Sequence, residues 1–128
     1  MKDVIHTDAA PAAVGPYSQA IRLDAQARLV YLSGQIGLDP RTGELVSDTF
    51  DHEVRQAFAN LKAVTEAAGG KLENIVKLTL FLTDLGAFTQ VNAIMSELIP
   101  EPFPARSTVG VSALPKGAQF EVEAILAL

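Results

Sequence analysis

The chain contains no cysteine, and this absence excludes several chemistries at once. Disulfide bonds, thiolate nucleophiles, iron–sulfur clusters and cysteine-ligated zinc all need a residue type that none of the 128 positions supplies. A chain without disulfides is typical of a reducing compartment. We therefore expect a soluble, cytoplasmic protein whose chemistry depends on other side chains.

Histidine is scarce, which narrows the choice of active sites. The two histidines, His6 near the start and His52 in a predicted helix, occupy unrelated places. A zinc site needs three or four clustered ligands. Ser33 has no nearby histidine and lacks the sequence context of a nucleophile elbow. We expect two solvated histidines and no metal. The chain also has no Gly-rich phosphate loop and no dinucleotide fingerprint.

Positive charge and long apolar runs are also limited. Ten Lys and Arg against fifteen Asp and Glu give a net charge of −5 and a pI of about 4.9. Nucleic-acid binding depends on clustered cations, so we expect no nucleic-acid partner. The apolar stretches are far shorter than the roughly 20 residues of a membrane span. The N-terminus lacks an apolar run of signal-peptide length. We therefore expect no membrane partner.

What is present is the composition of a globular domain. Hydrophobic residues make up 48% of the chain and charged residues 20%. A chain of this length can bury a real core, whereas two half-length domains would each be marginal. No internal repeat or linker divides it. We expect residues 1–128 to form a single domain.

Turn residues divide the first part of the chain. Residues 8–16 are rich in Ala, Pro and Gly and predict an ordered loop. Strands are expected over residues 17–23 and 28–33, with Asp24–Ala27 between them as a hairpin turn. Asp39–Gly43 contains Pro and Gly at the spacing of a turn.

Two segments show the period of an amphipathic helix. Ser47 or Asp48 offers an N-cap for the first helix, and Gly69-Gly70 ends it. The second helix is expected to follow from Asp84 and to end before three closely spaced prolines. The apolar stripes are Phe50, Val54, Phe58, Leu61, Val64 and Ala68 in the first helix, and Leu85, Phe88, Val91, Met95 and Leu98 in the second.

Alternating apolar residues predict strands over residues 74–83, 105–112 and 118–126. The order of strands and helices is that of an α+β protein in which two helices cover one face of a sheet. We expect the other face to be either a subunit interface or a plain solvated face. The residues predicted to lie on it are Lys77, Thr79, Arg106, Thr108, Glu121 and Glu123.

Arg106 is the most informative charged residue, because it is the only cation on either of the last two predicted strands. A guanidinium has five donors to satisfy. Pattern alone allows a structural ion pair with Glu121 or Glu123. It equally allows a fork for a substrate carboxylate, held by charge-assisted hydrogen bonds.

Other polar residues allow a structural and a functional interpretation. Glu121 and Glu123 are either solvated carboxylates or a base and its neighbour. Tyr17 either packs at a loop-to-strand junction or bonds a ligand. Asn92 lies on the apolar stripe of the second helix, where a buried amide needs a partner, and a structural tie to the backbone is favoured.

Four segments together resemble the YjgF/RidA family of reactive-intermediate (enamine/imine) deaminases. They are Ala10–Ala20, Ser33–Ile36, Pro104–Val109, and Leu114-Pro115 with Glu121–Ala124. The resemblance covers essentially the whole chain. It implies a chorismate-mutase-like α+β fold, with a mixed β-sheet and two helices packed on one face. It also implies a homotrimer with inter-subunit clefts.

The resemblance implies a function. Family members hydrolyse 2-imino acids such as 2-iminobutanoate and 2-iminopropanoate, or their enamine tautomers, to 2-keto acids and ammonia without a cofactor. They thereby clear reactive intermediates of pyridoxal-phosphate enzymes. By position, Arg106 matches the arginine that binds the substrate carboxylate. Glu121 matches the glutamate that handles the attacking water, and Tyr17 matches a tyrosine lining the cleft.

Three further positions match ligand-contacting residues of the family. Gly34 matches a backbone N–H donor, and Thr108 stands where another backbone donor lies. Asn92 matches an asparagine near the cleft. The best-known branch of the family has a cysteine where this chain has Thr108. A backbone contact does not need that thiol, so the substitution is compatible with activity.

Three alternatives to general imine clearance remain open from the sequence. One is a trimeric regulator that binds a small carboxylate without turnover; it needs Arg106 but not Glu121. A second is a ribonuclease, which the net charge and the lack of a placed histidine oppose. The third is a catabolic deaminase specialised for one product, such as an aminoacrylate derivative.

Overall fold

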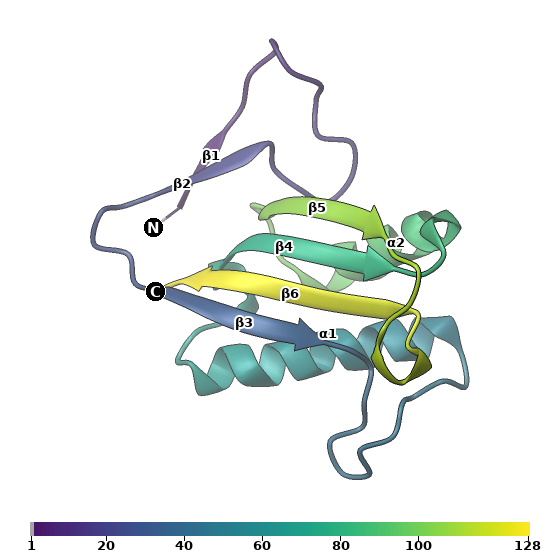
Figure 1. The fold of residues 1–128 in the computed structure, drawn as a ribbon. Coiled ribbons are helices and arrows are strands. Elements are labelled where there is room, and N and C mark those ends of the chain that lie inside the picture. The colour runs from purple at the N-terminus through teal and green to yellow at the C-terminus, as the bar shows by residue number, and fades with distance from the viewer. Residues whose placement is uncertain (1) are drawn as a thin grey trace.

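The computed structural model describes residues 2–128. These residues fold into six strands and two α-helices, arranged as a sheet lying against a helical layer, with a small second sheet to one side (Figure 1). The strands are β1 (Lys2–Ile5), β2 (Ala20–Leu23), β3 (Leu29–Gln35), β4 (Ile75–Leu82), β5 (Ala105–Gly110) and β6 (Phe120–Ala127). The helices are α1 (Phe50–Ala67) and α2 (Phe88–Leu98), and short 3₁₀ turns η1 (Leu72–Asn74), η2 (Leu85–Ala87) and η3 (Pro115–Gly117) connect elements.

The main sheet is mixed and has the strand order β3-β6-β4-β5. β4 and β5 are parallel, and β6 pairs antiparallel with both β3 and β4. Both helices lie behind this sheet in Figure 1. The predicted α+β class, with two helices on one face of a mixed sheet, is therefore confirmed.

The predicted hairpin between the second and third strands is wrong. β2 pairs antiparallel with β1, from Lys2 opposite Leu23 to Ile5 opposite Ala20. β3 instead pairs with the last strand of the chain. The expected turn at Asp24–Ala27 is present, with Ala27 N–H donating to the Asp24 carbonyl at 3.1 Å. Local turn chemistry was read correctly, but it does not determine which strands pair.

The helix boundaries differ from the prediction by a few residues. Thr49, rather than Ser47 or Asp48, is the N-cap of α1, and its hydroxyl accepts the backbone N–H of His52 at 3.0 Å. Gly69, with φ of +90°, follows the helix as expected. Asp84 caps the η2 turn through the N–H of Gly86, so α2 begins only at Phe88.

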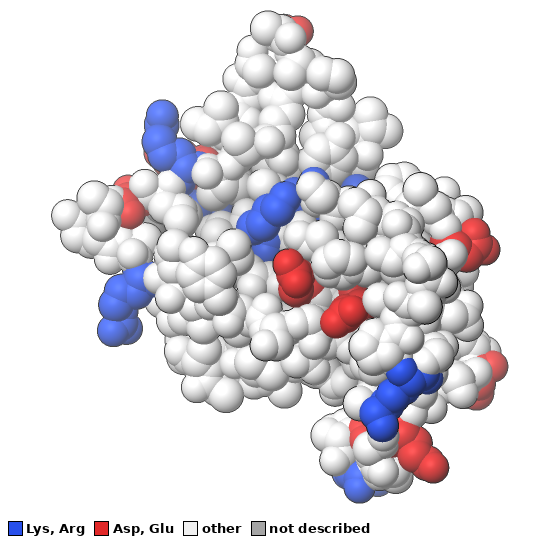
Figure 2. Space-filling model, in the orientation of Figure 1, with Lys and Arg blue, Asp and Glu red and all other residues white. Residues whose placement is uncertain are grey.

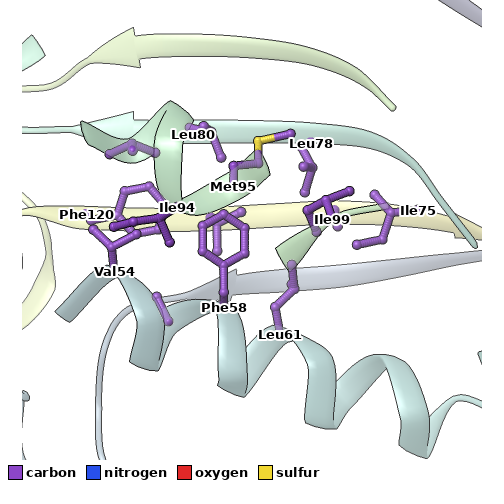
Figure 3. Packing of buried hydrophobic residues seen from close by; sticks show 14 of the residues in the cluster. Val54, Phe58, Leu61, Ile75, Leu78, Leu80, Ile94, Met95, Ile99 and Phe120 are labelled. Atoms are coloured by element: carbon purple, nitrogen blue, oxygen red, sulfur yellow. The ribbon is translucent and has the colours of Figure 1, made fainter. Parts of the chain in front are cut away.

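The core lies between the helices and the inner face of the main sheet (Figure 3). Phe58 of α1 and Phe120 of β6 stack in a tilted arrangement with ring centroids 5.6 Å apart. Three stripe members fall outside this core: Val64 is 39% exposed, Leu85 is 51% exposed, and Phe88 is half-buried away from the cluster. Ile94, which the predicted stripe omitted, is 2% exposed and packs in the core.

Strand register corrects the predicted faces of β5. Arg106 pairs with Leu78 and Thr108 pairs with Leu80 in the parallel β4–β5 ladder. Paired residues of neighbouring strands share a face. Leu78 and Leu80 are fully buried in the core. Arg106 and Thr108 therefore lie on the helix side, and the prediction that placed them on the open face is wrong.

The open face of the main sheet carries the remaining polar residues that the sequence placed there. Glu121 pairs with Phe81, and Glu123 pairs with Thr79. Lys77 bonds the Ser107 hydroxyl at 3.2 Å on the same side. Figure 2 shows the side of the molecule that faces the viewer in Figure 1: largely uncharged, with a few charged side chains near its middle. Large apolar side chains are exposed here, among them Tyr31 at 73% and Val109 at 39%.

Within residues 2–128, neither helix has the length and apolar character needed to span a bilayer.

Candidate functional site

The Arg106 side chain points from β5 toward α2. Its Nη1 donates to Oδ1 of Asn92 at 2.6 Å and lies 3.7 Å from the sulfur of Met95. The guanidinium carbon is 5.0 Å from the ring centroid of Tyr17 and 5.6 Å from that of Phe88. Both distances are within cation–π range. Two aromatic rings and one amide therefore fix the guanidinium from separate parts of the chain.

Among residues 2–128, the Arg106 guanidinium has no carboxylate partner. Of the two interpretations that the sequence left open, the structural ion pair with Glu121 or Glu123 is therefore not formed. Burial lowers the pKa of Arg106, and the nearby Tyr17 acts in the opposite direction. An arginine pKa starts high enough that the group stays charged. Nη2 and Nε have no hydrogen-bond partner among residues 2–128.

Asn92 is tied to a side chain and not to the backbone, contrary to the favoured expectation. Its amide oxygen accepts the proton of Arg106 Nη1. Phe88 lies one helical turn earlier, so both residues face the same direction on α2. The sequence analysis counted Phe88 only as a core residue. Its spacing of four from Asn92 is the signal that links it to this site.

A loop folded against β5 brings Tyr17 to the guanidinium. Ser18 N–H donates to the Pro104 carbonyl at 3.0 Å, and Ser18 forms a parallel bridge with Ala105. The Tyr17 hydroxyl accepts the N–H of Val14 at 3.3 Å, so the phenol is already bonded within its own loop. The predicted ordered loop is confirmed, and it positions the aromatic ring over Arg106.

Gly15 permits the close approach of this loop. Its φ is +116°, a conformation that L side chains rarely adopt. A Cβ at this position would lie 3.3 Å from Nδ2 of Asn92 and 3.7 Å from Nη2 of Arg106. A larger residue would therefore push the loop away from both side chains.

A second polar cluster pairs Glu121 of β6 with Gly34 of β3. A Cβ at position 34 would lie 2.8 Å from Cδ of Glu121 and closer still to Oε2. The β3–β6 ladder is irregular between Leu32 and Gln35, where Gly34 lies. The absence of a side chain at Gly34 leaves room for the half-buried Glu121 carboxylate.

The two clusters lie on opposite faces of the sheet in one chain. Arg106 shares the face of Leu78, whereas Glu121 shares the face of Phe81, and β4 separates their strands. The structure thus brings Tyr17, Asn92 and Arg106 together. It brings Gly34 to Glu121 separately.

Thr108 and a concavity lie near the cluster formed by Tyr17, Asn92 and Arg106. The Thr108 hydroxyl is buried without a hydrogen-bond partner in the described part of the chain. A concavity of about 680 Å³ opens between the loop at Gly15 and the end of α2. Neither Arg106 nor Glu121 lines it. This concavity therefore does not enclose the charged groups.

The histidines are on the surface, as predicted. The His6 side chain is 63% exposed and lies 3.1 Å from Asp8. The His52 side chain is 57% exposed and lies 2.8 Å from Asp48. Residues 2–128 contain no group of three or more His, Cys, Asp or Glu side chains arranged to hold a metal ion.

The fold and the aromatic-flanked guanidinium define a class of small α+β domains that carry a half-buried arginine on an edge strand of the sheet. The chain belongs to the YjgF/RidA family, because the family model described as Endoribonuclease L-PSP matches residues 7–128. This membership confirms the resemblance on which the sequence analysis relied.

Individual relatives are similar over almost their whole length. A protein of the mite Dermatophagoides farinae, named 2-iminobutanoate/2-iminopropanoate deaminase, is 46% identical over 127 residues, covering 99% of this chain and 97% of that protein. A human protein of the same name is 45% identical over 98% of this chain and 89% of its own length. The crystal structure of RidA from an Antarctic Psychrobacter is 48% identical, with a TM-score of 0.76 over 98% of this chain and 99% of that one.

Proposed function

We propose that this protein hydrolyses 2-imino acids, such as 2-iminobutanoate and 2-iminopropanoate, or their enamine tautomers, to 2-keto acids and ammonia. The observation that carries the proposal is the Arg106 guanidinium, which is half-buried, held by Asn92 and without an anionic partner in residues 2–128. Such a group suits a small carboxylate. The deaminase name of relatives about 45% identical supports the reaction type.

The reaction needs a bound substrate, an electrophilic carbon and a water molecule oriented toward that carbon. Arg106 binds the substrate carboxylate through its free donors. The protonated imine is attacked at C2 by water, which forms the C–O bond while Glu121 accepts a proton. Glu121 then returns its proton to the carbinolamine nitrogen. The C–N bond breaks as the hydroxyl oxygen forms the carbonyl and gives up its proton to Glu121, so ammonia leaves and the 2-keto acid remains; release of that proton to solvent restores the carboxylate. Acid–base assistance of this kind typically contributes about 10²–10⁴ in rate.

The proposed site is shared between subunits. Arg106 and Glu121 lie on opposite faces of one sheet, so a single chain does not present both to one small molecule. Packing the open sheet faces of a homotrimer together would bring Glu121 of one subunit to the edge strand of the next. The exposed Tyr31 and Val109 on that face support burial against another copy. In this arrangement Gly34 and Thr108 supply backbone donors.

Imine trapping tests the activity. An amino-acid oxidase or threonine dehydratase generates the imine, semicarbazide traps it, and the protein competes with the trap. Wild type should suppress trapping in proportion to its concentration, and Arg106→Ala should not. Full suppression by Arg106→Ala would refute the assigned role of Arg106.

Oligomers that mix two variants test whether the site is shared between subunits. Arg106→Ala and Glu121→Gln should each be inactive, and co-assembly should restore activity at the clefts that receive one intact residue from each subunit. Each variant mixed with itself is the control. Mixtures that stay inactive despite verified subunit exchange would place both residues in one subunit's site.

Two other functions give different outcomes. A carboxylate-binding regulator would bind a 2-keto acid in an Arg106-dependent way and show no suppression of trapping, with Glu121→Gln behaving like wild type. The family description names an endoribonuclease. The exposed histidines and a net charge of −5 oppose that activity here. RNA cleavage that persists in Arg106→Ala would point to another site or to contamination.

We also propose that the protein is cytoplasmic and that it has no nucleic-acid partner.

A further inference from the structure

A buried carboxylate on α1 has no place in the reaction described above. Glu53 is 0% exposed. Its Oε2 accepts the backbone N–H of Gln119 at 2.7 Å and that of Phe120 at 3.3 Å. Its Oε1 is buried without a hydrogen-bond partner among residues 2–128. A carboxylate buried with an unmatched oxygen is costly, so core packing alone does not account for it.

The two amides that Glu53 holds directly precede Glu121. At this end of the sheet, the pairing of β6 with β3 begins only at Val122. On the other side, Thr83 N–H donates to the Gln119 carbonyl at 3.2 Å. The Glu53 carboxylate therefore fixes the start of β6 where β3 does not.

Glu53 also borders the chain that leaves β3. A Cβ at Gly37 would lie 2.5 Å from the Glu53 carbonyl oxygen and 3.0 Å from its Cγ, so the two residues are in close contact. Gly34, three positions earlier, makes room for the Glu121 carboxylate. One residue of α1 thus contacts both segments that meet around Glu121.

We propose that Glu53 is a positioning residue that sets the place of Glu121 relative to the attacking water. It touches no substrate and acts through the backbone of Gln119 and Phe120. This inference rests on the proposed function, because it assumes that Glu121 handles the water. It predicts an effect on the chemical step and not on carboxylate binding by Arg106.

Three substitutions of Glu53 separate the effect of side-chain length from the effect of charge. Glu53→Gln keeps an oxygen acceptor at the same reach and should retain kcat within about threefold. Glu53→Asp keeps the charge but is one methylene shorter, and Glu53→Leu removes the acceptor. Both should lower kcat by about 10-fold or more, since a displacement of about 1 Å can cost 10²-fold. KM should stay near the wild-type value in all three.

Thr65→Val is the matched control. Thr65 is buried on the same helix, and its hydroxyl bonds the Leu61 carbonyl of that helix at 2.8 Å. The variant loses a buried hydrogen bond but should keep wild-type kcat. Hydrogen exchange of the peptide covering residues 118–122 gives a second readout, with faster exchange expected in Glu53→Asp and unchanged exchange in Thr65→Val.

The outcomes distinguish this inference from the proposed function. Suppose that Glu121→Gln loses imine hydrolysis while folded Glu53→Asp keeps it and shows unchanged hydrogen exchange at residues 118–122. This result would overturn the positioning role and leave the proposed function intact. If Glu53→Leu does not fold, Glu53→Asp decides the matter. Equal kcat values in Glu53→Asp and Thr65→Val would also overturn the positioning role. A wild-type protein that hydrolyses no imine would overturn the proposed function, and this inference with it.

Discussion

The two faces of the main sheet hold their charged residues in different ways. On the helix side, Arg106 enters an apolar layer and is fixed by Asn92 and two aromatic rings. On the open side, Glu121 lies beside Gly34, on a face that also exposes large side chains such as Tyr31. The covered face is built to hold a cation rigidly. In the proposed homotrimer, another subunit would complete the surroundings of the carboxylate on the open face.

The largest expected effect comes from removing the charge on the covered face. Arg106→Ala should lower kcat/KM by about 10²- to 10⁴-fold, because each lost charge-assisted hydrogen bond contributes about 1.5–3 kcal/mol. Imine trapping over a range of substrate concentrations gives the value. Arg106→Lys, which keeps the charge but not the fork, should recover only part of the loss. Equal activity in Arg106→Ala and wild type would contradict the assignment.

The next effect concerns the open face. In Gly34→Ala the added Cβ would meet the Glu121 carboxylate, which is the mobile end of a side chain. The carboxylate should swing away, so kcat should fall about 10-fold or more while thermal stability changes little. Gly110→Ala is the control, since its nearest neighbour lies 3.8 Å away. A Gly34→Ala enzyme with wild-type kcat would show that the position of Glu121 does not matter.

A substitution on the covered face should separate stability from binding. Asn92→Asp places a carboxylate next to Nη1 of Arg106, where it neutralises the guanidinium. The melting temperature should rise. KM should rise about 10-fold, because the new anion competes with the substrate carboxylate. Asn92→Leu, which removes the acceptor without adding charge, should lower the melting temperature instead. A KM unchanged by Asn92→Asp would contradict carboxylate binding here.

The smallest effect is expected outside both faces. Arg55 on α1 bonds Glu97 on α2 at 2.9 Å and lowers the pKa of that carboxyl. A lowered carboxyl pKa adds stability above the unfolded value, and this is lost as pH falls. Arg55→Gln should therefore lower the melting temperature slightly at pH 7, and the difference should shrink below pH 4.5, the ordinary Glu97 value. Imine hydrolysis should not change. A loss of activity would show that the helix layer influences the site.

The sequence predicted elements better than it predicted contacts. Periodicity located α1, α2, β4 and β6, because one apolar face of each packs into the core. It missed β1, a four-residue strand, and paired β2 with the wrong neighbour. Strand pairing depends on distant segments, and β3 pairs with the C-terminal strand. No local pattern contains that information.

The same limit applied to the candidate site. Arg106 was identified because a lone cation on a strand needs an anion, but alternation put it on the wrong face. β5 is an edge strand with one strand neighbour in the main sheet, and none of its residues is fully buried, so the apolar pattern is weak. Register with the buried Leu78 decides the face. The role of Glu53 depends on contacts 66 and 67 residues away along the chain, which spacing does not reveal.

The loop that carries Tyr17 has a consequence for affinity. The loop is anchored to the β5 strand at Ser18, while residues 8–15 are exposed. Undocking the loop would remove one of the two rings from Arg106. Only the docked fraction of molecules then has the complete site, and the apparent dissociation constant equals the intrinsic one divided by that fraction. Substitutions that change only the docking equilibrium will therefore alter affinity without any change in the contacts that the bound carboxylate makes.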